Sequence, residues 1–168
     1  FAFSEAVPKR ITFDQTQGRS PFKFARMGSM IWYANTNDYI ANGKDRFKGS
    51  IVKISFPEND TTLLIDSSLL RIAEQRIDID EMKLDKSGNR LLIATDKERI
   101  WRHSFFATYY FIDLKSKKLQ SISKNNTKLR NVKFSPNGNF VAYVREDNNL
   151  YTYDLYKKRE RRISSSGS

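Results

Sequence analysis

The residues of this chain that are best suited to chemistry lie in one short stretch, Trp101-Arg102-His103-Ser104. An arginine guanidinium donates paired hydrogen bonds to carboxylates or carbonyl oxygens, and neighbouring aromatic rings strengthen such bonds by excluding water. His103 is the single histidine of the 168 residues. The stretch therefore indicates a polar binding site around Arg102. The alternative is a structural role, in which Trp101 and Phe105 pack under a hairpin while Arg102 pairs with an acid.

Other kinds of chemistry find little support in the sequence. The chain has no cysteine, which excludes disulfides, thiolate catalysis and cysteine-bound zinc. It also contains no Gly-x-Ser-x-Gly nucleophile elbow and no glycine-rich phosphate loop. Asp78, Asp80 and Glu81 lie close together, but without a histidine or a calcium-type loop they are interpreted as a solvated loop. We therefore expect no catalytic residue, no metal and no cofactor in these residues.

The formal net charge of +11 on its own permits binding to nucleic acid or to an anionic membrane. The densest basic run is Lys157-Lys158-Arg159-Glu160-Arg161-Arg162, which we interpret as a solvated turn between two strands. A phosphate-binding patch is the alternative interpretation. No run of apolar residues approaches the ~20 that a membrane helix needs. Nucleic-acid binding would rest on the net charge alone, so we expect no nucleic-acid partner.

Three internal repeats organise the elements that must position Arg102. Residues 22–34, 82–94 and 132–144 each place Lys second, a large apolar residue third and Gly seventh, and each closes with an apolar run. The pattern indicates a strand, a tight turn and a second strand, since Ser135-Pro136-Asn137-Gly138 has typical turn composition. The repeated glycines are 60 and 50 residues apart, which is the spacing of four-stranded propeller blades.

The outer halves of the blades recur as well. Residues 110–114 and 150–155 are predicted strands with Asp113 and Asp154 at the same place just before the turn, and residues 49–55 and 61–66 are the corresponding strands of the first blade. The sequence therefore predicts an all-β fold, a partial β-propeller of about three four-stranded blades. Residues 1–168 form the N-terminal part of one propeller domain, with blades at about 22–67, 79–124 and 129–165.

The second blade carries an insertion. Gly88 and Asp113 are 25 residues apart, whereas Gly138 and Asp154 are 16 apart, so nine extra residues lie in its second hairpin. Insertions between the strands of a repeat form loops at one end of the array, often the functional end. Because the insertion contains the Trp-Arg-His-Ser stretch, we expect a long hairpin to carry Arg102 there.

The insertion and the strand after it resemble the propeller of dipeptidyl peptidase IV and its bacterial relatives, serine peptidases of the prolyl oligopeptidase superfamily. The resemblance covers most of residues 11–165. The matching segments are residues 101–104, 109–114, 132–138, 141–144 and 149–151, and residues 11–13 match more weakly. It implies an eight-bladed propeller followed by an α/β-hydrolase domain that removes N-terminal dipeptides with Pro or Ala second. It also implies that Arg102 binds a substrate backbone carbonyl, with Trp101, His103 and Ser104 supporting its loop.

Two features of the family are missing from these 168 residues. Neither the paired glutamates that bind the peptide amino group nor the catalytic triad is present, so the parent protein is expected to be the enzyme and this chain alone is not. Three blades leave two apolar faces uncovered, so we expect the chain to continue past Ser168. The implied partners are a peptide, the rest of the propeller, the hydrolase domain and a second copy in a homodimer. The implied location is periplasmic, secreted or membrane-anchored outside the cytoplasm. The alternative function is a non-catalytic propeller that binds protein or glycan.

Overall fold

The computed structural model describes residues 30–33, 36–102, 104–123 and 126–167. In these residues the chain forms antiparallel β-strands and two short 3-10 helices, η1 (Asp45–Phe47) and η2 (Ser67–Leu69), without any α-helix. None of the helices in this part of the chain is long and apolar enough to cross a membrane. The strands build three four-stranded sheets and one two-stranded sheet, which confirms the predicted all-β class.

Each four-stranded sheet is a meander of consecutive strands. The first sheet contains β1 (Met30–Trp32), β2 (Tyr39–Asn42), β3 (Ile51–Ile54) and β4 (Thr61–Ile65). The second contains β7 (Glu81–Leu84), β8 (Arg90–Trp101), β9 (Ser104–Asp113) and β10 (Lys118–Ser121). The third contains β11 (Arg130–Phe134), β12 (Phe140–Val144), β13 (Leu150–Asp154) and β14 (Arg159–Arg162). The small hairpin between the first two sheets consists of β5 (Arg71–Ile72) and β6 (Gln75–Arg76).

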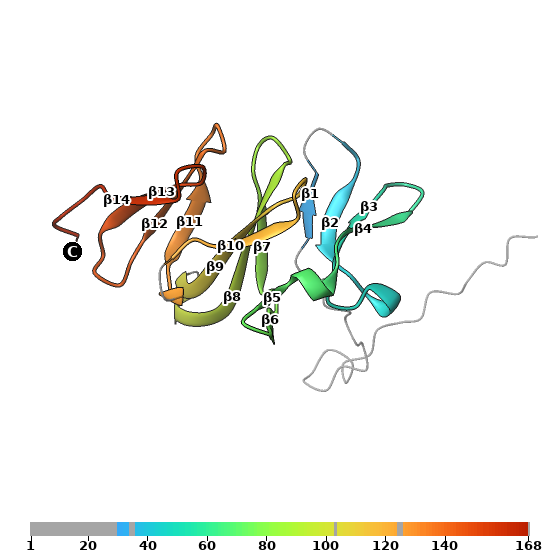
Figure 1. Ribbon diagram of the computed structural model, residues 1–168, viewed down its shortest axis with the longest axis horizontal. Helices are drawn as coiled ribbons and strands as arrows, with labels where there is room; N and C mark the ends of the chain where they lie inside the picture. Colours follow the sequence, from blue (N-terminus) through green and yellow to red (C-terminus); the bar gives the residue numbers. More distant parts are fainter. Residues whose placement is uncertain (1–29, 34–35, 103, 124–125, 168) are drawn as a thin grey trace, which may run out of the picture.

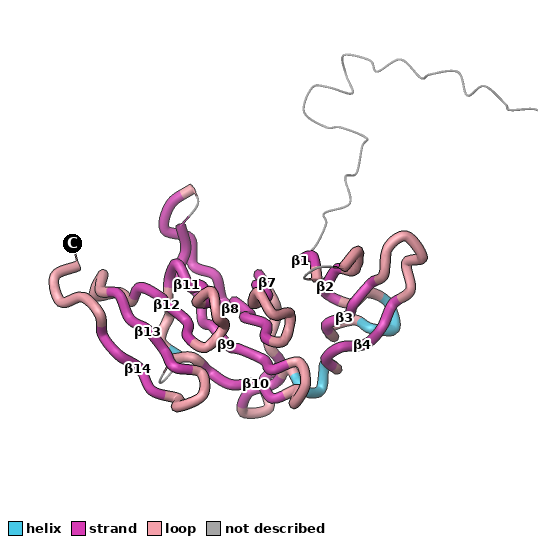
Figure 2. Tube along the Cα trace, turned by 90° about the horizontal axis from the view of Figure 1, so that it is seen from above, coloured by secondary structure: helices cyan, strands magenta, loops and turns pink. Residues whose placement is uncertain are grey.

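The three sheets stand side by side in the order of the sequence (Figure 1). Seen from above, they form a fan with β1, β7 and β11 along its inner side and β4, β10 and β14 along its outer side (Figure 2). This radial arrangement of four-stranded meanders is that of consecutive propeller blades. The prediction of a partial propeller with about three blades is therefore confirmed.

The repeated glycines close the first turn of the second and third sheets, as predicted. Gly88 has φ +74° and Gly138 has φ +69°, a left-handed conformation that glycine adopts without steric cost. In the second sheet the Asp85 carboxylate accepts the N–H groups of Asn89 and Arg90, each at 2.9 Å. The turn thus sets the register in which β7 and β8 pair.

The structure corrects the alignment of the first repeat. The repeat predicts that residues 30–34 form the second strand of a blade, but among the described residues β1 is the first strand of its sheet and pairs with β2. In the described part of the turn between them, Thr36 Oγ1 donates to the carbonyl of Tyr33 and accepts the N–H of Asp38, both at 3.1 Å. A shared glycine at position 28 was too little to fix the alignment. Residues 11–18 and 22–29 lie outside the described residues.

The second sheet is buried on both faces, because successive side chains of β8 and β9 point to opposite neighbours. One core lies toward the third sheet and includes Leu92, Ala94, Tyr109, Phe111, Val132, Val141 and Tyr143. The other lies toward the first sheet and includes Ile40, Ile51, Ile65, Leu91, Ile93, Tyr110 and Ile112. The blade that carries the insertion is therefore held from both sides.

Candidate functional site

The β8–β9 hairpin extends well beyond its sheet. β8 has 12 residues and β9 has 10, whereas the matching strands β12 and β13 of the third sheet have five each. Side chains of β8 are buried from Leu91 to Thr95 and exposed from Asp96 onward. Figure 2 shows the hairpin leaving the fan on the side of the innermost strands. The predicted insertion is therefore a projecting β-hairpin.

Two irregularities of pairing turn the hairpin away from the plane of the sheet. The register shifts between Thr95 and Glu98, and again between Arg99 and Trp101. Asp96, which lies in the first shift, has φ +53°. An extra residue in one strand of an antiparallel pair bends that strand and redirects its side chains. The hairpin therefore leaves the plane of the sheet just after Thr95, the last buried residue of β8.

Contacts with the inner strand β7 hold one side of the hairpin base. Lys97 Nζ lies 2.7 Å from Glu81 Oε2 and 4.0 Å from the centre of the Phe105 ring. Glu81 also pairs with Lys83 at 3.2 Å. Partial burial acts to raise the pKa of Glu81, but the two lysines outweigh it and hold that pKa below its ordinary value of 4.5. The glutamate is therefore charged at neutral pH and anchors the hairpin.

Contacts with the third sheet hold the other side of the base. Lys128 Nζ lies 2.9 Å from Glu98 Oε2, and this bond lowers the pKa of Glu98. The Arg130 guanidinium lies 5.7 Å from the centre of the Phe106 ring. The hairpin base is thus tied to the inner strand of its own sheet on one side and to the start of the third sheet on the other.

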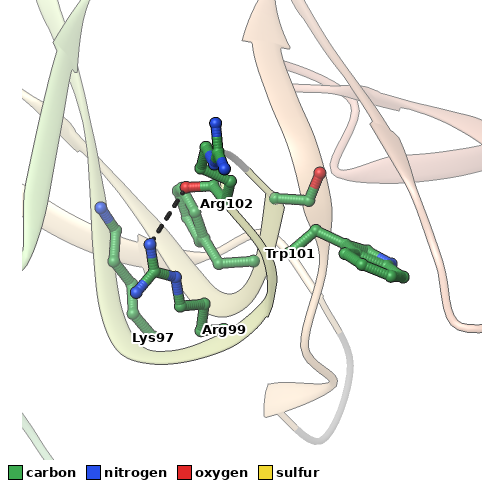
Figure 3. Close-up of a pocket in the computed structure, with 6 residues that line it drawn as sticks. Lys97, Arg99, Trp101 and Arg102 are labelled. Atoms are coloured by element: carbon green, nitrogen blue, oxygen red, sulfur yellow. Dashed lines mark hydrogen bonds between the residues drawn. The ribbon is translucent and has the colours of Figure 1, made fainter.

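The tip of the hairpin is free of such ties. Arg102 is exposed in the turn after β8, and its guanidinium has no ion pair with any residue that the structure describes. The Trp101 side chain is 78% exposed. Figure 3 shows Arg99 pointing to the main chain of Arg102, whose carbonyl accepts a hydrogen bond from Arg99 Nη2 at 3.3 Å, while Trp101 points the other way.

An open groove of about 390 Å³ lies along the hairpin and is lined by Lys97, Arg99, Trp101, Arg102, Ser104 and Phe105. It brings Arg102 together with two of the three residues expected to support it, Trp101 and Ser104. The third, His103, lies outside the described residues. The groove combines cationic donors with an apolar floor, so it is suited to binding carbonyl or carboxylate oxygens.

The alternative to a binding site is a structural role, in which Trp101 and Phe105 pack under the hairpin and Arg102 pairs with an acid. Phe105 packs against the core between the second and third sheets, as that alternative expects. Trp101 does not pack under the hairpin, because most of its surface is exposed. Arg102 is exposed and has no acidic partner within the described residues, unlike the ion pair that this alternative expects.

Two lining residues were missed from the sequence, Lys97 and Arg99. The signal that could have found them is strand alternation, since residues 97 and 99 of a continuing strand point to one side. The neighbouring acids have structural partners: Asp80 accepts the N–H of Lys97 at 3.1 Å, and Glu81 pairs with lysines. Within the described residues, no group of three His, Asp or Glu side chains could hold a metal.

The basic run near residue 160 contributes in a different way. Lys157 and Lys158 are exposed in a turn, as predicted, but the following residues form β14. Glu160 of that strand accepts a hydrogen bond from Tyr143 at 2.5 Å and pairs with Arg145 at 2.7 Å. The run therefore belongs in part to the structure of the third sheet.

Comparison with known proteins places these observations in a family. Residues 85–168, half of the chain and including the hairpin tip, match the family described as dipeptidyl peptidase IV (DPP IV) N-terminal region. Dipeptidyl aminopeptidase B of Saccharomyces cerevisiae is 31% identical over 119 residues, which cover 70% of this chain and 14% of the yeast protein. A probable dipeptidyl-aminopeptidase B of Sclerotinia sclerotiorum is 26% identical over 172 residues, 95% of this chain and 18% of that protein.

The fold has a solved counterpart. The crystal structure of Porphyromonas gingivalis dipeptidyl peptidase 4 matches 96% of this chain and 23% of its own chain, with a TM-score of 0.74 and 23% sequence identity. The chain thus spans less than a quarter of the length of each of these relatives. From the family match and the shared propeller fold, the chain belongs to the dipeptidyl peptidase IV N-terminal region family.

Proposed function

We propose that this chain is the part of a serine-type dipeptidyl peptidase that binds the N-terminal end of a peptide, and that Arg102 binds a backbone carbonyl of that peptide. The observation that carries the proposal is the exposed guanidinium at the tip of a braced hairpin, without an ion pair among the described residues. The family of the chain and the names of its relatives support the reaction class.

The geometry suits a positioning role. A guanidinium offers five N–H donors in a rigid plane, and a charge-assisted bond to a carbonyl is about twice as strong as a neutral one. Because a backbone carbonyl is present in every peptide, Arg102 would orient the substrate without reading its side chains. The two-sided anchoring of the hairpin base supports this, since a fixed arm loses little entropy when the peptide binds.

The flanking residues would have different roles. Ser104 is half-buried and is proposed to support the turn together with His103. Trp101 is 78% exposed, so it could support the turn only through a contact outside the described residues.

In the same proposal, the nucleophile, base and oxyanion hole belong to a hydrolase domain outside these 168 residues. The propeller would control access to that domain, and the preferred peptides would carry Pro or Ala second. A location outside the cytoplasm and a homodimer of the whole protein belong to the proposal as well. All of these features are taken from the resemblance to dipeptidyl peptidase IV.

The test is substitution of Arg102 by Ala and by Lys in the full-length protein. For Xaa-Pro and Xaa-Ala p-nitroanilides we expect Arg102→Ala to lower kcat/KM by about 30- to 900-fold, which corresponds to roughly 2–4 kcal/mol. Arg102→Lys should recover part of the loss, because it keeps the charge but not the planar donors. Arg161→Ala on β14 removes one exposed charge away from the hairpin and serves as the control. An unchanged kcat/KM for Arg102→Ala would refute the role of this residue.

A further inference from the structure

The groove beside Arg102 has an excess of positive charge. Three of its six lining residues are cationic, Lys97, Arg99 and Arg102, and none of the six is acidic. The nearby acids do not pair with Arg99 or Arg102: Glu81 pairs with Lys83 and with Lys97, and Glu98 pairs with Lys128. Asp96 lines a different pocket. Within the described residues, the charges of Arg99 and Arg102 therefore have no counterion.

The three cations are not equally available to a ligand. Lys97 already pairs with Glu81 at 2.7 Å and lies over the Phe105 ring, so it adds to the local positive potential and little else. The Arg99 side chain uses one N–H for the Arg102 carbonyl at 3.3 Å, the one hydrogen bond that this side chain makes to the described residues. Four of its five donors remain. Arg99 is therefore anchored in place and still able to bind an anion.

The chemistry of the groove selects the ligand. A guanidinium with free parallel N–H groups matches the two oxygens of a carboxylate, and Phe105 adds apolar surface beside it in the groove. Arg99 lies next to Arg102, since it bonds to the main chain of that residue (Figure 3). A peptide residue whose carbonyl is held by Arg102 would direct its own side chain along this groove.

We infer that the hairpin groove gives the enzyme a preference for peptides with an acidic first residue, and that Arg99 binds the carboxylate of that side chain. The inference rests on the proposed function, because the peptide reaches Arg99 only if Arg102 holds its backbone. Arg99 would then be a specificity-determining residue, while Arg102 acts on every substrate.

The test compares Glu-Ala and Gln-Ala p-nitroanilides, which differ only in charge, on the full-length protein. We expect kcat/KM for Glu-Ala to exceed that for Gln-Ala by about fivefold, a ratio at the upper end for an exposed ion pair. Arg99→Gln should bring the ratio to about one, and Arg99→Lys should keep part of it. The ratio should also fall toward one at ~1 M salt, where the screening length is about 3 Å. Lys115→Gln, an equal charge change in the exposed turn at the far end of β9, should leave the ratio unchanged.

The outcomes separate this inference from the proposed function. If Arg102→Ala leaves kcat/KM for Gln-Ala unchanged, the proposed function fails. If Arg102→Ala lowers kcat/KM for both peptides but the wild-type ratio is one, only the inference fails. A ratio that Arg99→Gln does not alter, even when the rate for both peptides falls, would mean that Arg99 merely supports the turn, and it would overturn the inference. The inference would also be overturned if the enzyme preferred an acidic residue at the third position, measured as Gln-Ala-Glu against Gln-Ala-Gln amides, and showed no such preference at the first position.

Discussion

Two buried tyrosines in neighbouring sheets differ in whether their hydroxyl groups are hydrogen-bonded. Tyr109 and Tyr143 are each 1% exposed and lie in the same core. The Tyr143 hydroxyl donates to Glu160 Oε1 at 2.5 Å, whereas the Tyr109 hydroxyl has no partner within the described residues. Burial raises the pKa of both phenols, with a further contribution from Glu160 at Tyr143 and from Glu81 at Tyr109. Both hydroxyls therefore stay protonated at neutral pH.

Phenylalanine substitution should separate the two residues. We expect Tyr143→Phe to destabilise the propeller by about 1.5–3 kcal/mol, the range for a hydrogen bond to a charged group. Tyr109→Phe should be neutral or stabilising, because it removes a buried hydroxyl that lacks a partner among the described residues. The measurement is the urea concentration at which the propeller of each full-length variant unfolds. Equal losses in the two variants would show that a group outside the described residues satisfies Tyr109.

Among single residues, the sequence predicts those of the groove that stand out by residue type and misses those that do not. Arg102 stands out because it lies between a tryptophan and the single histidine of the chain, inside an insertion. Lys97 and Arg99 have no such neighbours. Their place in the groove depends on the strand continuing into the insertion, which residue types alone do not reveal.

At the scale of elements, the projecting hairpin depends on the ion pairs at its base. The folded-state pKa of Glu81 lies below its ordinary value of 4.5. A carboxylate with a lowered pKa contributes stability that is fully present above its ordinary value and is lost as pH falls through the folded value. The ion pair between Glu81 and Lys97, which joins β7 to the hairpin, should therefore be present at neutral pH and vanish in acid.

Glu81→Gln tests this anchoring by hydrogen–deuterium exchange. At pH 7 the amides of the hairpin base should exchange about two- to fivefold faster in the variant, as expected for loss of a partly exposed ion pair. The difference from the wild type should disappear once the pH lies below the folded-state pKa of Glu81, because both side chains are then uncharged. Amides of β12 and β13 provide the internal reference. A difference that persists in acid would contradict the electrostatic explanation.

Turn chemistry decides which elements the sequence predicts. The turns before β8 and β12 contain glycine at positive φ, and both were found. The β5–β6 hairpin was not predicted, because Ala73 and Glu74 form its turn with φ +45° and +65°. Two-residue hairpin turns of this kind ordinarily contain Asn or Gly, so no local signal marks this one.

At the scale of the molecule, a contact between sheets explains the lysine at the second position of the second repeat. Lys83, the second residue of its repeat, donates to the carbonyl of Val132 in the next sheet at 3.2 Å. Arg90 donates to the carbonyl of Gly138, and its guanidinium lies 4.6 Å from the Tyr156 ring centre. The repeat predicts strands within each blade, but these inter-blade bonds depend on how the blades are stacked.

The most direct test of Arg102 changes both partners of the proposed hydrogen bond in the full-length protein. The peptide is a dipeptide anilide in which sulfur replaces the carbonyl oxygen of the first residue, since sulfur is a weak acceptor. The measurement is the ratio of kcat/KM for the oxygen and sulfur substrates, in the wild type and in Arg102→Ala. We predict a ratio of about ten in the wild type and about one in the variant, a coupling of ~1.4 kcal/mol. The same ratio in both proteins would contradict the assignment of Arg102 to the peptide carbonyl.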